Sequence, residues 1–163
     1  MKKLILVRHA KSDWGNPGLD DFDRPLNDRG KRDAPVMAAR LRDRKPGIDV
    51  LLSSPARRAA KTAKIFAETL GIKNSDIVFN DELYLAGPIT FYNVLAELDN
   101  EIETVALFSH NNGLTDFANR LTDARIDNIP TCGIFAVQAD CNQWSDFKAA
   151  PKTFLFFDYP KAV

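Results

Sequence analysis

Three shortages in the sequence each exclude a class of protein: cysteine is scarce, neither charge is in excess, and apolar runs are short. The two cysteines among the 163 residues, Cys132 and Cys141, have no partners at the spacing of a metal site. We expect two unpaired thiols in a reducing cytoplasm. Lysine plus arginine and aspartate plus glutamate number 22 each, so the formal net charge is zero. This balance argues against a nucleic-acid-binding protein, although a local basic patch would not show in the total.

No apolar run approaches the roughly 20 residues that a helix needs to span a bilayer. The first residues, Met1 to Val7, imitate the charged and apolar parts of a signal peptide. Arg8 and His9 interrupt the apolar stretch early, which makes it too short for a signal peptide. The sequence therefore predicts a cytoplasmic protein without a membrane partner.

Short apolar runs alternate with segments of helical periodicity, a pattern typical of an α/β protein with a largely parallel sheet. The predicted strands cover residues 4–7, 50–52, 77–79, 104–108, 133–139 and 153–158. The last two are expected to pair antiparallel. The predicted helices cover about residues 27–44, 54–71, 89–98 and 114–121. No repeat, low-complexity segment or linker interrupts this pattern, so we predict a single domain over residues 1–163.

Residues at the ends of the first two helices set their predicted limits. Asn27 can cap the first helix, but Pro35 requires either a later start or a kink. Ser54 and Pro55 are predicted as the N-cap and first turn of the second helix, which Gly71 ends. The residues expected to form the buried face of the third helix are Ile89, Tyr92, Leu95 and Ala96.

The only two histidines of the chain occupy equivalent places. His9 and His110 each follow the carboxyl end of a predicted strand. In open parallel sheets, ligands bind outside the carboxyl ends of the strands. If the two strands are neighbours, both imidazoles enter one crevice. This shared position favours a functional site over two separate structural histidines.

Arginines next to these positions indicate an anionic ligand. Arg8 precedes His9, while Arg57 and Arg58 lie in the first turn of the helix that follows the second strand. A helix N-terminus favours anions, and a guanidinium group matches the oxygens of phosphate. We expect one of the adjacent pair to serve the site and the other to be solvated, and helical geometry leaves the choice open.

Three blocks of sequence carry a resemblance to a known family: Val-Arg-His-Ala at 7–10, Ser-Pro-Ala-Arg-Arg-Ala-Ala-Lys-Thr-Ala at 54–63, and Ser-His-Asn at 109–111. In this order the blocks resemble the histidine phosphatase (phosphoglycerate-mutase-like) superfamily. The short length and the phrases at 8–12 and 23–26 resemble its compact phosphohistidine phosphatase branch, which lacks a large cap. The resemblance implies a three-layer α/β/α sandwich with a mostly parallel central sheet.

The resemblance also implies roles for individual residues. The family's phosphate-binding arginine precedes an Ala-x-x-Thr-Ala pattern, which selects Arg58 rather than Arg57. Arg8, Arg58 and His110 are then expected to hold the phosphoryl group around the nucleophile, His9. The residues expected to bind substrate nearby are Ser12, Arg24 and Asn111.

These roles amount to covalent catalysis without a metal or other cofactor. A neutral imidazole is a nucleophile, and its usual pKa of about 6.5 leaves it largely neutral at physiological pH. His9 would attack phosphorus, and water would then hydrolyse the phosphohistidine. We expect a further group, such as a backbone carbonyl, to orient His9.

The chain departs from the family at the proton donor. Many members place a glutamate in the segment that here runs from Asp81 to Gly87, at the position of Tyr84 or Leu85. Glu82 stands one or two places early. A missing acid disfavours alkoxide leaving groups, which need protonation, and suits a phosphoramidate such as phosphohistidine. This departure favours protein phosphohistidine over sugar phosphates.

The polar segment at 12–24 is expected to be a loop near the site. Its aspartates at 20, 21 and 23 either are solvated or include one that orients water or a site arginine, and they lack the pattern of a calcium loop. Trp14 and Phe22 either rim the pocket or anchor the loop by burial.

Three functions compete at this point. The first is a phosphatase acting on a phosphorylated protein such as a phosphotransfer domain, and the second is a phosphatase of a small phosphomonoester. The third is an inactive module that binds a phosphorylated ligand. No pattern in the sequence predicts the physiological substrate or the oligomeric state.

Overall fold

A single mixed sheet of six strands, in the order β3-β2-β4-β1-β5-β6, forms the centre of the computed structural model, which describes residues 1–162. The strands are β1 (Lys2–Arg8), β2 (Val50–Ser53), β3 (Ile77–Phe79), β4 (Thr104–Ser109), β5 (Ile134–Ala139) and β6 (Lys152–Asp158). Strands β1 to β4 are parallel to one another wherever they pair. Strand β5 is antiparallel to both β1 and β6, which confirms the predicted antiparallel pair.

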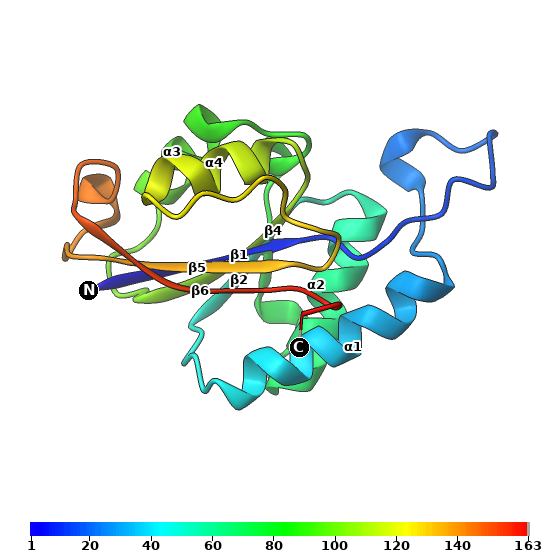
Figure 1. Ribbon diagram of the computed structural model, residues 1–163, viewed down its shortest axis with the longest axis horizontal. Helices are drawn as coiled ribbons and strands as arrows, with labels where there is room; N and C mark the ends of the chain where they lie inside the picture. The colour runs from blue at the N-terminus through cyan, green and yellow to red at the C-terminus, as the bar shows by residue number, and fades with distance from the viewer. Residues whose placement is uncertain (163) are drawn as a thin grey trace.

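Helices cover both faces of the sheet, as Figure 1 shows. They are α1 (Asp28–Asp43), α2 (Arg57–Leu70), α3 (Pro88–Ala96) and α4 (Gly113–Leu121). Helices α1 and α2 pack on one face, and α3 and α4 on the other. This arrangement is the predicted three-layer α/β/α sandwich, and no cap domain is inserted within residues 1–162.

Residues 4–7 of the central strand β1 form a continuous apolar run because helices cover both faces of the sheet. Leu4 and Leu6 belong to the core beneath α3 and α4, while Ile5 and Val7 belong to the core beneath α1 and α2. Successive side chains of a strand point to opposite faces, so a strand covered on both sides is apolar at every position.

The limits of α1 and α2 differ in part from the prediction. The Asn27 side chain accepts a hydrogen bond from the Gly30 amide, and α1 runs from Asp28 through Pro35, so the later start is wrong. Helix α2 starts at Arg57 rather than near Ser54. The Ser54 hydroxyl accepts the Ala56 amide at 3.2 Å and lies in the site described below, so it is not the N-cap. Gly71, at φ +73°, ends α2 as predicted.

The predicted buried face of α3 is wrong in two positions. Ile89 is 70% exposed and Ala96 is also exposed, while Phe91 and Val94 are buried beside Leu95. The physical reason is that Phe91 stacks on Phe117 of α4, with ring centroids 5.1 Å apart. The buried face of α3 is therefore the one that carries Phe91, about one residue from the predicted face. Within residues 1–162, no helix is both long and apolar enough for a membrane span.

Candidate active site

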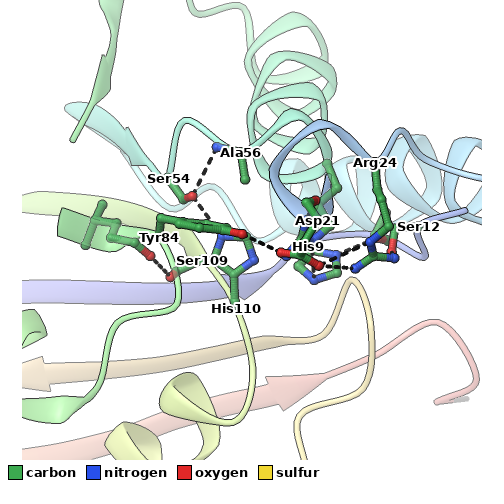
Figure 2. Close-up of polar contacts among 12 residues, drawn as sticks. His9, Ser12, Asp21, Arg24, Ser54, Ala56, Tyr84, Ser109 and His110 are labelled. Atoms are coloured by element: carbon green, nitrogen blue, oxygen red, sulfur yellow. Dashed lines mark hydrogen bonds and ion pairs between the residues drawn. The ribbon is translucent and has the colours of Figure 1, made fainter. Parts of the chain in front are cut away.

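The two histidines lie together because their strands are neighbours. Strands β1 and β4 are parallel, and Arg8 pairs with Ser109 at their carboxyl ends. The next residues, His9 and His110, therefore leave the sheet at the same edge, with ring centroids 5.2 Å apart (Figure 2). Both are buried, with exposed fractions of 7% and 1%.

A backbone carbonyl fixes the tautomer of His9. Its Nδ1 lies 2.7 Å from the Ala10 carbonyl oxygen. A carbonyl only accepts hydrogen bonds, so Nδ1 carries the proton and Nε2 keeps its lone pair. The Arg58 Nε–H donates to this Nε2 at 3.4 Å. Burial lowers the pKa of His9 to about 3, so the ring is neutral at physiological pH.

His110 is held through Ser54. His110 Nε2 lies 2.8 Å from the Ser54 hydroxyl oxygen, which already accepts the Ala56 amide and can donate its own proton to the ring. That arrangement leaves the ring proton on Nδ1, which has no hydrogen-bond partner among residues 1–162. Burial lowers the pKa of His110 to about 3 as well. The ring is therefore neutral at physiological pH, and His110 lines the cavity described below.

Arg8 and Arg58 bring guanidinium groups to the same place. Arg8 Nη1 donates to the Ile129 carbonyl at 2.8 Å, and its Nε is buried without a partner in the described part of the chain. Arg58, at the start of α2, is only 2% exposed. Its neighbour Arg57 is exposed and donates to the Asp23 carbonyl at 3.4 Å. Of the adjacent pair, Arg58 is thus the one beside His9.

The loop at 12–24 adds a third guanidinium. Arg24 is 7% exposed and donates to the Ser12 hydroxyl at 2.6 Å, so both residues lie in the site. Its guanidinium lies 3.4 Å from the ring centroid of Trp14, which is 70% exposed at the rim. Phe22 faces a different cleft and contacts Tyr84 edge-on at 5.2 Å.

Asp21 links the loop to the arginines. Its carboxylate accepts from Arg58 Nη2 at 2.9 Å, from Arg24 Nη2 at 3.0 Å and from the Tyr84 hydroxyl at 2.5 Å. Burial raises the pKa of Asp21, but the hydrogen bonds from Tyr84, Arg58 and Arg24 outweigh it and hold the pKa well below the usual value. Asp20 and Asp23 are exposed, so Asp21 alone of the three contacts the site arginines.

Two further candidates contribute less directly. Asn111 lines the cavity, but its side chain accepts from the Thr115 amide and hydroxyl and donates to Asn128. These bonds occupy Asn111 in holding the start of α4. Glu82 is exposed and does not line the cavity, whereas Leu85 does.

Together these residues enclose a cavity of about 220 Å³. Four of its lining residues are cations and one is a carboxylate, so it suits an anion. The lining consists of Arg8, His9, Lys11, Ser12, Trp14, Asp21, Arg24, Arg58, Leu85, His110, Asn111 and Thr131. Residues 1–162 contain no group of three or more histidine, cysteine or acidic side chains arranged to hold a metal ion.

Sequence reasoning missed two contributors to this site. The sequence predicts Ser54 only as a helix cap, although its place directly after β2 puts it at the same edge as the histidines. It identifies Tyr84 only as one of two residues at the glutamate position, and the contact of Tyr84 with Asp21 spans 63 positions of sequence. A long-range contact of this kind leaves no local pattern.

The chain is similar in sequence and in fold to known proteins. The model of the histidine phosphatase superfamily (branch 1) matches residues 4–83. An uncharacterised protein of Mycobacterium tuberculosis is 31% identical over 165 residues, covering 95% of this chain and all of its own length. Phosphoserine phosphatase 1 of Hydrogenobacter thermophilus is 39% identical over 85 residues, covering 51% of this chain and 38% of that enzyme. The solved structure of SixA from Agrobacterium tumefaciens, provisionally a phosphohistidine phosphatase, is 30% identical, covers 98% of both chains and gives a TM-score of 0.83.

Proposed function

Because the chain belongs to the histidine phosphatase superfamily, we propose that it removes phosphoryl groups from phosphohistidine in proteins through a phosphorylated His9. The observation that carries this proposal is the state of the His9 ring. Its Nδ1 proton is bound by the Ala10 carbonyl, which leaves the Nε2 lone pair directed at Arg58 in a cavity rich in cations. A buried, neutral and oriented imidazole is a nucleophile ready for in-line attack.

In the first step, His9 Nε2 forms a bond to phosphorus while the bond to the leaving group breaks. Negative charge on the equatorial oxygens is stabilised by Arg8, Arg58 and Arg24, with the Nδ1–H of His110 as a further donor. The unpartnered Arg8 Nε and His110 Nδ1 are donors that a phosphoryl group can satisfy. Ser12 and Asn111 line the same cavity and are assigned to substrate binding.

In the second step, water attacks the phosphorus of phosphorylated His9, the P–N bond breaks, and inorganic phosphate leaves. The electron pair returns to Nε2 and restores the neutral imidazole. The reaction needs no metal, because guanidinium groups and hydrogen-bond donors of the chain supply the positive potential. This metal independence is part of the proposal and is tested below.

The leaving group supports a phosphoramidate substrate. Among residues 1–162, Asp21 is the only carboxylate that lines the cavity, and its donors hold it ionised, so it is a poor general acid. An alkoxide leaving group needs such an acid. The imidazole of phosphohistidine can leave already protonated on its other nitrogen and needs none.

The size of the cavity supports a protein as the substrate. Small-molecule sites usually measure about 300–1,000 Å³, and this cavity is smaller, at about 220 Å³. Most of a larger substrate would then lie outside, on the surface of the protein. The similarity to SixA points in the same direction. We assign this activity to residues 1–163 as one domain.

One observation favours a second candidate, a phosphatase of a small phosphomonoester. Phosphoserine phosphatase 1 of Hydrogenobacter thermophilus is similar to this chain over 85 residues, about half of its length. Phosphoserine is therefore the alternative substrate to compare.

The test is hydrolysis, with EDTA present, of a phosphohistidine-bearing protein, phosphoserine and p-nitrophenyl phosphate. The proposal expects EDTA-resistant activity that favours phosphohistidine and is lost in His9→Ala. Efficient hydrolysis of phosphoserine alone would transfer the function to small phosphomonoesters. Wild-type activity in a folded His9→Ala variant would overturn the mechanism for both substrates.

A further inference from the structure

A second cleft, with a volume of about 630 Å³, lies beside the catalytic cavity. It lies between the start of α1, one face of α2 and the chain from Phe22 to Leu26. Its lining includes one carboxylate and four cations, namely Lys31, Arg57, Lys61 and Lys64. We call this pocket the basic cleft. A chain of zero net charge thus carries a concentrated positive surface here.

Three of the cations lie in a row on α2. Arg57, Lys61 and Lys64 are four and three residues apart, the spacing of neighbours on one helix face. Ala63 and Phe66 lie on the opposite face and are buried in the core. Like charges at these spacings repel one another and destabilise an isolated helix. An anionic partner would relieve this repulsion.

The charges of the basic cleft are free for such a partner. All four cations are exposed, and none takes part in an ion pair within the described residues. Arg57 donates to a backbone carbonyl, that of Asp23, at 3.4 Å. Exposed unpaired charges of one sign attract a complementary surface and speed its association.

The basic cleft and the catalytic cavity share a wall. Adjacent residues alternate between them: Arg57 lines the cleft while Arg58 lines the cavity. In the loop, Phe22 and Asp23 line the cleft while Asp21 and Arg24 line the cavity. A substrate whose phosphorylated side chain enters the cavity therefore has its neighbouring surface over the cleft.

We propose that the basic cleft docks an acidic segment of the protein whose phosphohistidine enters the catalytic cavity. This proposal rests on the proposed function and names the chemistry of its substrate. The first argument is distance. Arg57 and Lys64 are seven residues apart, which is about 10 Å along a helix, so the row of cations matches several carboxylates spaced along one segment.

The second argument is the mixed lining of the cleft. Between the cations lie apolar side chains, namely Phe22, Pro25, Leu26, Pro55 and Ala60. A protein segment with glutamate or aspartate beside apolar residues matches this combination. Its carboxylates can pair with the cations of the cleft, and its apolar side chains can be buried against the apolar lining. Zero net charge over the whole chain favours such a local protein contact over a nucleic acid.

The test uses two phosphohistidine peptides of equal length, phosphorylated chemically with phosphoramidate. One carries glutamates around an apolar core beside the phosphohistidine, and the other carries glutamines in their place. For the wild type we expect kcat/KM to favour the acidic peptide by about tenfold or more at low salt, through KM. The variant Lys61→Glu/Lys64→Glu should bring the ratio of the two peptides to about one or below.

The matched control is Lys73→Glu/Lys161→Glu, which changes charge equally at exposed positions outside the basic cleft. It should keep the wild-type ratio. Equal rates for both peptides in the wild type would overturn the docking proposal while leaving the phosphatase intact. No hydrolysis of either peptide by the wild type would instead overturn the proposed function. Binding of single-stranded DNA that depends on Lys61 and Lys64, without a peptide preference, would assign the cleft to nucleic acid and also overturn the proposal.

Discussion

Arg58 Nη2 donates to Asp21 Oδ2 at 2.9 Å, so the loop carboxylate occupies the guanidinium that stands beside the nucleophile. Arg24 donates to the other oxygen of the same carboxylate at 3.0 Å. Figure 2 shows Asp21 between His9, Arg24 and Tyr84. The carboxylate thus holds donors that a phosphoryl group would take, and the two anions compete for them.

This competition predicts tighter phosphate binding when the charge of Asp21 is removed. In Asp21→Asn, the inhibition constant for inorganic phosphate should fall about fivefold, the effect of roughly 1 kcal/mol for a partly exposed ion pair. Product inhibition of the wild type and of Asp21→Asn, measured at neutral pH, tests this. Weaker phosphate binding in Asp21→Asn would mean that the carboxylate positions the arginines rather than competing with substrate.

The lowered pKa values of the two histidines predict acid destabilisation. Both change from 6.5 to about 3 on burial. Between these values the unfolded chain binds more protons than the folded one, so stability is fully present above about pH 6.5 and falls as the pH decreases toward 3. The slope should reach at most about 1.4 kcal/mol per pH unit for each histidine.

Denaturant unfolding between pH 7 and pH 4.5 checks this slope in the ligand-free protein. His9→Asn should unfold with a shallower pH dependence than the wild type, whatever its stability at pH 7. If the free energy of unfolding keeps the wild-type pH dependence in both His9→Asn and His110→Asn, the buried imidazoles do not cause the acid destabilisation. Asp21, whose pKa is also lowered, loses its contribution only below its usual pKa of 3.8.

Leu85 is the cavity residue at which a proton donor can be added. It lines the cavity, at one of the two positions where the family glutamate is expected. Leu85→Glu should raise kcat/KM for phosphoserine relative to phosphohistidine by about 10²-fold, the lower range of general acid catalysis. Leu85→Gln is the matched control and should not raise it. If Leu85→Glu leaves the ratio of kcat/KM for phosphoserine and phosphohistidine unchanged, the missing proton donor does not explain the preference for phosphohistidine.

Ser54 is predicted to position His110 through their 2.8 Å hydrogen bond. Ser54→Ala should lower kcat about tenfold for phosphohistidine, because the ring loses the partner that directs Nδ1–H toward the phosphoryl group. Ser54→Thr keeps the hydroxyl and should restore most of the rate. Equal losses in both variants, with unchanged thermal unfolding, would contradict a role for the hydroxyl.

The sequence predicted the parts of the site that depend on topology alone. His9 and His110 follow apolar runs, and parallel pairing of β1 and β4 necessarily brings such residues to one edge. The family motif then selected Arg58 over Arg57, which the helix spacing alone could not do. The alternating runs and helices predicted an α/β protein with a largely parallel sheet, and the family resemblance implied the three-layer sandwich.

Other parts depended on tertiary contacts that have no local pattern. The helix start after Ser54 was wrong because the serine hydroxyl faces His110 instead of capping the helix. The inward face of α3 was wrong because Phe91 stacks on a residue of α4. The basic cleft joins Lys31 of α1 to the row on α2, and a balanced total charge concealed it.

The most direct test of the account is to trap the phosphoenzyme and determine which atom carries the phosphoryl group. Wild-type protein, mixed rapidly with phosphoramidate and quenched in alkali, should show one phosphohistidine by ³¹P NMR and peptide mapping. The account predicts phosphorylation of His9 at Nε2, because the Ala10 carbonyl occupies Nδ1–H. Turnover with the phosphoryl group on His110, on Nδ1 of His9, or on no residue at all would contradict it.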